Sequence, residues 1–294
     1  MTPSIGIPGT AVRVSPSREC ADEWGVVLAA ADIPHWLRRR LDGWALIVTV
    51  SDAAAALASL DAYDRENTGE GADPGDAVAP SRPVTLAGIY VALLLIGLFA
   101  ITGSREGHSE WFQRGSADAT RMMAGEWWRA VTALTLHADV PHLLGNALAG
   151  ALLVTAVCQQ LGPGVGLWLL LLAGAGGNAL TAVVHRGGHV SVGASTVVFG
   201  AIGILAALRI VAPGAVGSRR GKWWVAVAAS VVLLALLGTE PNADLLAHVF
   251  GLLAGGAVGL LGVLTIRWMP PASVQWLLVA AAGAAVYAAW RLAF

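Results

Sequence analysis

Three short segments carry the side chains that could perform chemistry in an otherwise apolar sequence. Gly193-Ala-Ser195 places a hydroxyl among small residues, His248 supplies an imidazole, and His142 and Asn146 lie four residues apart. A serine hydroxyl can attack a carbonyl carbon when a histidine accepts its proton. Asn146, His142 and the backbone N–H of Ser195 could then donate hydrogen bonds to the resulting oxyanion.

Each segment also has an ordinary explanation. Gly-Ala-Ser is a common small-residue pattern in packed membrane helices, and a lone polar residue can be satisfied by its neighbours. His248, however, lies three residues before Gly251, and Gly251 and Gly255 form a flat stripe that lets another helix approach closely. A Ser–His hydrogen bond needs such an approach. Phe199, one turn after Ser195, could then lie against the imidazole ring.

No acidic residue is assigned as a third catalytic member. Asp244 lies four residues before His248 but nearer the outer end of the predicted span, so the sequence predicts a dyad of Ser195 and His248. His185 and His189 are also four residues apart, which invites a reading as a metal site. They flank a Gly-Gly pair and have no carboxylate or cysteine nearby, so we expect neither a metal nor another cofactor.

The composition indicates a membrane protein with a polar front part. Of 294 residues, 56% are hydrophobic and 13% are charged, against about 25% charged in soluble domains. Residues 1–129 hold 27 of the charges and residues 130–294 hold 10. The net charge of −1 gives no electrostatic footprint for nucleic acid. Two distant cysteines predict neither a disulfide framework nor a Cys-based zinc site.

Uncharged stretches predict six membrane spans and a seventh at the C-terminus. A helix of about 20 residues crosses a hydrocarbon core of about 30 Å. The predicted spans lie in 84–101, in 140–185 (two spans with a turn at 162–164), and in 187–208, 223–238, 245–266 and 274–290. Basic residues in the 209–222 loop and Arg267 predict a cytoplasmic N-terminus. The first residues lack a signal-peptide pattern, and we expect a multi-pass protein of a bacterial inner membrane.

Residues 1–66 predict a small cytoplasmic α+β domain. The expected elements are helices at 19–32 and 51–66 and strands at 36–40 and 44–50. Ser51 is expected to cap the second helix. Residues 67–83 are rich in Gly, Pro, Asp and Ser and predict a flexible linker. Nothing in the domain suggests catalysis; a regulatory partner of unknown identity and a folded tail without a specific ligand both stay open.

The order of these motifs resembles that of the rhomboid family of intramembrane serine proteases. The resemblance covers residues 84–266 and rests on the motifs Trp128-Arg129, His142-x-x-x-Asn146, Gly193-x-Ser195 and Ala247-His248-x-x-Gly251-x-x-x-Gly255. It implies an all-α polytopic fold with a six-helix core and a water-filled cavity open to the outer face. It also implies that Ser195 is the nucleophile, that His248 is the general base, and that transmembrane protein substrates are cleaved near the membrane surface.

The resemblance further assigns His142 and Asn146 to the oxyanion hole and Trp128-Arg129 to an outer-loop motif with a structural role. Two residues depart from the family's usual pattern. Thr196 follows the nucleophile where the family often has Gly, and it could alter the rate or the choice of substrate. Phe199 stands where the family often has Tyr, and it keeps the ring that stacks on the histidine. The front domain and the C-terminal span at 267–294 are interpreted as additions to the core.

Two other classes of function stay open from the sequence. A non-catalytic relative would bind client transmembrane segments and guide their trafficking or degradation, although it would have no need for both a serine and a histidine. A transporter or channel could use the intramembrane histidines as a proton path. The sequence has no acidic residue between 140 and 239 and no detectable inverted repeat, which disfavours a transporter.

Overall fold

The structure, a computed structural model, describes residues 9–40, 43–67, 85–107, 109–211, 244–266 and 268–294. These residues fall into two compact units, and each unit is described by itself. The first takes in the described residues up to 67 together with 266 and 268–269. The second takes in those at 85–211, 244–265 and 270–294. The predicted linker and the predicted span at 223–238 lie almost wholly outside the described residues.

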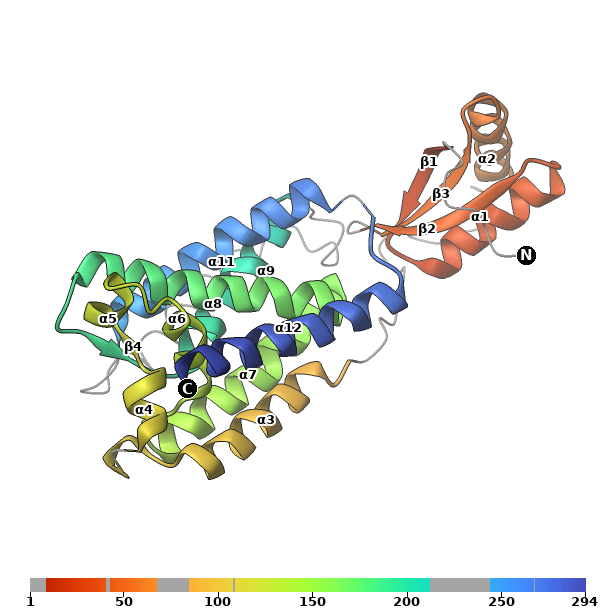
Figure 1. The fold of residues 1–294 in the computed structure, drawn as a ribbon. Helices are drawn as coiled ribbons and strands as arrows, with labels where there is room; N and C mark the ends of the chain where they lie inside the picture. Colours follow the sequence, from red (N-terminus) through yellow and green to blue (C-terminus); the bar gives the residue numbers. More distant parts are fainter. Residues whose placement is uncertain (1–8, 41–42, 68–84, 108, 212–243, 267) are drawn as a thin grey trace. The chain divides into compact units, whose positions relative to one another are not determined.

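The first unit is a three-stranded antiparallel sheet with two helices (Figure 1). Its elements are β1 (Gly9–Ser15), α1 (Arg18–Ala30), β2 (His35–Arg40), β3 (Gly43–Thr49) and α2 (Ala53–Asn67). The strand order is β1-β3-β2, so β3 is central. Because alternate strand residues point to opposite faces, Leu46 and Val48 share one face, and they form a core with Leu28 of α1 and Leu60 of α2.

Two details of the first unit differ from the expectation. Strand β1 was not among the predicted elements. Its seven residues include Arg13 and give little signal in the sequence, and they form a strand through their pairing with β3. Helix α2 begins at Ala53, and Ser51 does not cap it. The Ser51 hydroxyl instead shares a hydrogen bond of 2.7 Å with the Thr49 hydroxyl. The Asp52 carbonyl accepts from the Ala56 N–H at 2.8 Å, which places Asp52 at the N-cap.

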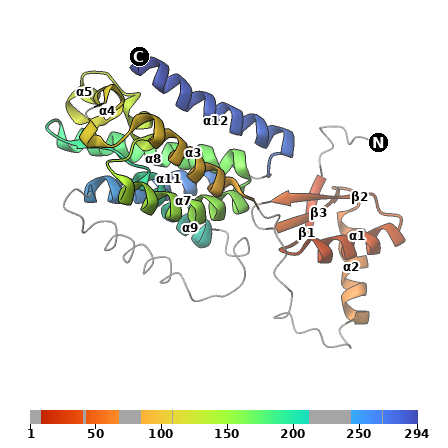
Figure 2. The same ribbon diagram turned by 90° about the horizontal axis from the view of Figure 1, so that it is seen from below.

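The second unit is a bundle of apolar helices (Figures 1 and 2). They are α3 (Ala87–Thr102), α7 (Val140–Leu161), α8 (Pro163–His185), α9 (Ser195–Val211), α11 (Leu245–Thr265) and α12 (Ala272–Ala293). Of the described residues, five helical stretches are long and apolar enough to cross a membrane, and α9 is a shorter apolar helix. The turn predicted at 162–164 is present between α7 and α8, with Gly162 at a φ of +80°. The fourth predicted span begins at Ser195 rather than at 187, because 187–194 form a loop with the short strand β5 (Val190–Ser191).

Glycines determine how closely these helices pack. Helix α8 contacts α7, α9, α11 and α12, whereas α3 packs on α7. A Cβ atom added to Gly255 of α11 would overlap the carbonyl oxygen of Gly200 in α9 and lie 2.6 Å from its Cα. Such an approach of two helix backbones is possible only without side chains between them. The glycine spacing therefore correctly predicts a close helix neighbour for α11.

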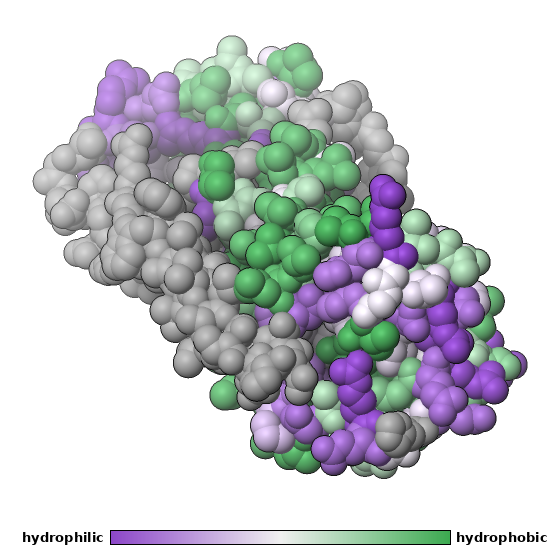
Figure 3. All heavy atoms as spheres, turned by 90° about the vertical axis from the view of Figure 1, so that its left-hand side faces the viewer, coloured by the Kyte–Doolittle hydropathy of each residue, from purple (hydrophilic) through white to green (hydrophobic). Residues whose placement is uncertain are grey.

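The outside of the bundle is apolar. Leu148, Leu152, Leu264 and Leu277 are each between 65% and 69% exposed. Exposed leucines on three long apolar helices, α7, α11 and α12, suit lipid rather than water. The chain is therefore an integral, multi-pass membrane protein. The end of the bundle that carries α4, α5 and β4 differs, since hydrophilic residues gather there beside the apolar ones (Figure 3).

The hydrophilic end is formed largely by the segment between α3 and α7, here called the outer segment (residues 103–139). Its elements are η1 (Arg105–Gly107), α4 (Glu110–Gly115), β4 (Ala117–Asp118), α5 (Ala119–Met123), α6 (Arg129–Thr132) and η2 (Ala133–Thr135). Strand β4 pairs antiparallel with β5, which lies just before α9. The outer segment is thereby joined to the loop that leads into Ser195.

Helix α12 is hydrogen-bonded to the rest of the bundle near its start. The Gln275 side chain accepts from the N–H groups of Gly164 (2.7 Å) and Val165 (3.0 Å) and donates to the carbonyl of Leu161 (3.1 Å). The first N–H groups of α8 and the last carbonyls of α7 have no partner within their own helices. One amide side chain from α12 therefore completes both helix ends.

The end of α12 is attached to the outer segment. Trp290 Nε1 donates to the Thr135 hydroxyl at 3.2 Å, and Arg114 donates to the carbonyl of Ala293 at 3.2 Å. The Trp290 ring occupies the space that a side chain at Gly115 would fill. The C-terminal helix is thus a packed part of the bundle.

Candidate active site

The loop before α9 brings Ser195 against helix α7. Gly193 has a φ of +123°, a conformation that favours glycine. A Cβ at this position would lie 2.6 Å from Cε1 of His142, so the imidazole of His142 packs directly on the Gly193 backbone. The Gly193 N–H donates to the carbonyl of Ala133 in the outer segment at 2.9 Å. Ser195 then begins α9 and is 7% exposed.

Helix α11 places His248 beside the first turns of α9. The His248 imidazole stacks on the Phe199 ring with centroids 4.5 Å apart and an interplanar angle of 24°. Phe199 lies one turn after Ser195, and His248 is itself 4% exposed. A Cβ at Gly251 would lie 2.5 Å from the carbonyl oxygen of Thr196, so the two backbones meet there. His248 and the residues that follow Ser195 in α9, Thr196 and Phe199, thus belong to one interface between α9 and α11.

Helix α7 presents His142 and Asn146 on the face that packs toward α9. Asp139 caps this helix by accepting from the His142 N–H at 2.8 Å. Asn146 is 1% exposed, and its Nδ2 donates to the His142 carbonyl at 2.9 Å. Its Oδ1 has no hydrogen-bond partner among the described residues. An amide NH2 carries two hydrogens, so Nδ2 can also donate to a bound group, whereas Oδ1 can only accept.

The acidic residue closest to His248 in sequence serves as a cap. Asp244 accepts from the Ala247 N–H at 3.0 Å, and its other carboxylate oxygen lies 2.6 Å from Nε2 of His189. Burial acts to raise the pKa of Asp244, but the hydrogen bonds to the carboxylate, chiefly those from Ala247 and His189, outweigh it and lower that pKa. His185 stacks on His189 with ring centroids 4.1 Å apart. The two histidines considered as metal ligands therefore stack on each other, and His189 also contacts the Asp244 carboxylate.

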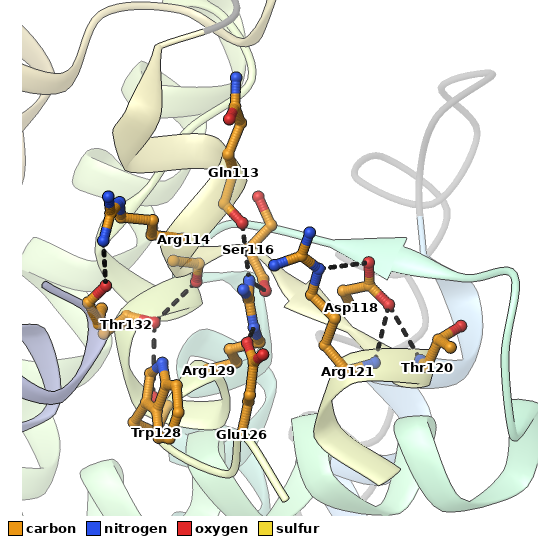
Figure 4. A network of polar contacts seen from close by, with 12 residues as sticks. Gln113, Arg114, Ser116, Asp118, Thr120, Arg121, Glu126, Trp128, Arg129 and Thr132 are labelled. Carbon is orange, nitrogen blue, oxygen red and sulfur yellow. Dashed lines mark hydrogen bonds and ion pairs between the residues drawn. The ribbon is translucent and has the colours of Figure 1, made fainter. Parts of the chain in front are cut away.

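Trp128 and Arg129 lie in the outer segment, where Arg129 organises a buried polar network (Figure 4). The Arg129 Nε donates to Glu126 at 2.6 Å, and one terminal nitrogen donates to the carbonyls of Gln113 (3.1 Å) and Ser116 (3.0 Å). The guanidinium is 2% exposed, so these bonds hold the turn after α4 against α6. The structural role that the resemblance implies for Trp128-Arg129 stays a prediction.

His137 is a further residue of the site that the sequence did not single out. Its ring is fully buried, lies 5.5 Å from the His142 ring, and accepts through Nε2 from the N–H of Ala194 at 3.5 Å. Burial, with a smaller contribution from His142, lowers the pKa of His137 to about 3, so the imidazole is neutral. The only signal in the sequence was its position, five residues before His142.

Comparisons with known proteins agree on one family. A family model described as a rhomboid domain matches residues 124–265. YdcA of Bacillus subtilis (strain 168) is 35% identical over 133 residues, which are 45% of this chain and 65% of YdcA. The rhomboid protease GluP of the same organism is 27% identical over 186 residues, 61% of this chain and 35% of GluP. RHOMBOID-like protein 4 of Arabidopsis thaliana is 33% identical over 155 residues, 52% of this chain and 38% of that protein. The chain spans less than two thirds of each of these relatives.

Proposed function

Because the chain belongs to the rhomboid family, with residues 124–265 as its rhomboid domain, we propose that it is an intramembrane serine endopeptidase. Ser195 is the nucleophile and His248 is the general base. His142, Asn146 and the N–H of Ser195 bind the oxyanion. The substrates are transmembrane proteins, cut near the outer face of the membrane.

The observation that carries the proposal is the stack of Phe199 on His248, one helical turn from Ser195. A stacked ring restrains the imidazole from one side, which a dyad needs when no carboxylate orients the base. Nδ1 of His248 has no partner among the described residues. This supports a two-residue mechanism, in which packing replaces the third member of a triad.

The surroundings of Ser195 support binding of an oxyanion. Ser195 opens α9, and the N–H groups of a first helical turn favour negative charge. The His142 ring packs on Gly193, two residues before the nucleophile, and Asn146 follows one turn later on α7. Neutral donors of this kind stabilise a tetrahedral intermediate in an apolar site without any buried permanent charge.

The proposed reaction proceeds in two halves. His248 accepts the hydroxyl proton as Ser195 Oγ bonds to the substrate carbonyl carbon, and the carbonyl oxygen becomes the oxyanion. The imidazolium gives this proton to the leaving amine as the peptide C–N bond breaks, which leaves an acyl-enzyme. Water then attacks the acyl carbon as His248 accepts its proton. The bond between the acyl carbon and Ser195 Oγ breaks, His248 returns the proton to Oγ, and the new carboxyl end leaves.

The depth of the site supports cleavage close to the membrane surface. Helix α11 begins at Leu245, so His248 lies about one turn, roughly 5 Å, from its start. Ser195 is the first residue of α9. Both lie at the helix ends next to β4, β5 and the hydrophilic end of the bundle, from which water can reach the acyl-enzyme.

The test is labelling of the purified chain with a fluorophosphonate probe, together with cleavage of a model single-span substrate in detergent. Ser195→Ala is expected to abolish both, and His248→Ala is expected to abolish cleavage. Ser59→Ala is a matched control, because it removes a serine hydroxyl in α2 of the first unit, where it bonds to the Ala55 carbonyl of the same helix, and it should be labelled and cleave as the parent does. Cleavage by Ser195→Ala at the parental rate would show that the proposed mechanism is wrong. Absence of cleavage by the parent, with unaltered function in cells carrying Ser195→Ala, would favour the non-catalytic alternative.

We propose further that the N-terminus is cytoplasmic in a bacterial inner membrane. Cys20 lies in the first unit, whereas Cys158 is 2% exposed within α7. A membrane-impermeant maleimide should therefore label lysed cells at Cys20 and leave intact spheroplasts unlabelled. Equal labelling of both preparations would reverse the proposed orientation.

A further inference from the structure

The residue after Ser195 begins a buried chain of hydrogen bonds. The Thr196 hydroxyl donates to Oδ1 of Asn178 in α8 at 3.1 Å. Nδ2 of Asn178 donates to the carbonyl of Ala130 in α6 at 2.9 Å. Because a carbonyl can only accept, the Asn178 amide must turn its NH2 to Ala130 and its oxygen to Thr196. The Thr196 hydroxyl is therefore the donor.

The methyl group of Thr196 fills a space left by two glycines. A Cβ added to Gly177 of α8 would lie 2.5 Å from the Thr196 methyl carbon, and one added to Gly251 of α11 would lie 3.0 Å from it. Thr196 is 1% exposed. Its side chain is thus enclosed where α8, α9 and α11 meet, with the methyl packed and the hydroxyl bonded.

This position bears directly on the nucleophile. Consecutive residues on an α-helix point about 100° apart around the axis, so the direction of one side chain determines that of the next. Holding Thr196 between α8 and α11 therefore sets the rotation of the first turn of α9. That rotation determines where Oγ and the N–H of Ser195 point.

We infer that Thr196 and Asn178 are positioning residues, which hold the first turn of α9 in the orientation that the reaction of Ser195 requires. The inference rests on the proposed protease function. It also gives Thr196 a role of its own, as the residue that ties α9 to the outer segment through Asn178 and Ala130. The absence of a side chain at Gly177 leaves room for the Thr196 methyl group beside the nucleophile.

A buried threonine on a membrane helix has a simpler use, which Thr181 illustrates. The Thr181 hydroxyl donates to the carbonyl of Gly177, four residues earlier on the same helix, at 2.9 Å. Such a bond satisfies the hydroxyl without linking two elements. Thr196 instead bonds across to another helix. Thr181 is equally buried at 1% exposure, one turn from Asn178, and serves as the matched control.

The experiment compares kcat, KM and the unfolding temperature of full-length variants acting on one single-span substrate. Thr196→Val keeps the shape of the side chain and removes the hydroxyl. It should lower kcat by about tenfold to a hundredfold and leave KM within about twofold, because misplaced reacting groups affect the transition state more than binding. Thr196→Ser should restore kcat to near the parental value. Thr181→Val should keep the parental kcat.

The inference is overturned if Thr196→Val keeps the parental kcat, if Thr181→Val loses as much, or if Thr196→Ser is as slow as Thr196→Val. If Thr196→Val fails to fold, the comparison is made between Thr196→Ser and Thr196→Ala. These two variants differ only in the hydroxyl, and both side chains are smaller than threonine. Equal kcat values for those two would then overturn it. A failure of the protease proposal is distinguishable from a failure of this inference. In the first case Ser195→Ala would cleave the substrate as fast as the parent, whereas in the second Ser195→Ala would be inactive and the threonine variants would cleave like the parent.

Discussion

Gly255→Ala tests whether the close contact of α9 and α11 is needed for activity. The added methyl would overlap the Gly200 carbonyl oxygen and lie 2.6 Å from Gly200 Cα, where ordinary contact begins at 3.4 Å. Both are backbone atoms, so no change of side-chain rotamer relieves the overlap. The helices must separate by on the order of 1 Å, and a displacement of that size at a reacting pair costs about a hundredfold in rate.

The same chain offers a matched control in the neighbouring residue. A Cβ at Gly256 would meet no atom within 4 Å. Gly256→Ala should therefore keep the parental kcat and gain up to about 1 kcal/mol from its higher helix propensity. Gly255→Ala gains the same propensity but suffers overpacking of about 1–3 kcal/mol, so it should be the less stable of the two.

The assay measures cleavage of a single-span substrate at saturating concentration, with the unfolding temperature in the same detergent. Gly255→Ala is expected to lose about a hundredfold in kcat relative to Gly256→Ala. If the two variants cleave within twofold of each other, the geometric argument that joins His248 to Ser195 across this interface is refuted.

Two further predictions concern other parts of the second unit. Gln275→Leu leaves buried N–H and carbonyl groups at the ends of α7 and α8 without their partner, and should lower the free energy of unfolding by about 1–3 kcal/mol or more. Trp276, the next residue, is 66% exposed, so Trp276→Leu should change the unfolding temperature little. Equal losses of stability in the two variants would contradict the role of Gln275. Burial lowers the pKa of His137 from 6.5 to about 3, so its contribution to stability is complete above pH 6.5 and is lost as the pH falls from 6.5 toward 3. Unfolding temperatures of the parent should therefore fall more steeply over this range than those of His137→Gln, and parallel profiles would contradict the neutral, buried imidazole.

Features that depend on local spacing could be predicted from the sequence. The turn after α7 follows from Gly162 and Pro163, and the close packing of α11 follows from glycines four residues apart. Helical periodicity also placed Phe199 one turn from Ser195, where its ring could reach a histidine. These inferences need only the geometry of a single helix and the absence of a side chain.

Features that depend on pairs distant in sequence could not be predicted in the same way. Thr196 bonds to Asn178, 18 residues earlier, and Gln275 bonds to Gly164, 111 residues earlier. Each polar residue is recognisable in an apolar stretch as costly, but its partner depends on how whole helices pack. Strand β5 has only two residues, and its partner β4 lies on the far side of two predicted spans.

The bond between Gln275 and the first turn of α8 has a consequence for the order in which the chain matures. The helical hairpin of α7 and α8 emerges from the ribosome well before Gln275, which follows Gly164 by 111 residues. At translation rates of 5–20 residues per second, this interval is roughly 5 to 20 s. During that time the hairpin ends must be hydrated or covered by another protein. Helix α12, which is synthesised later, therefore completes the hairpin of α7 and α8, and a nascent chain shortened before α12 would be a natural target for quality control.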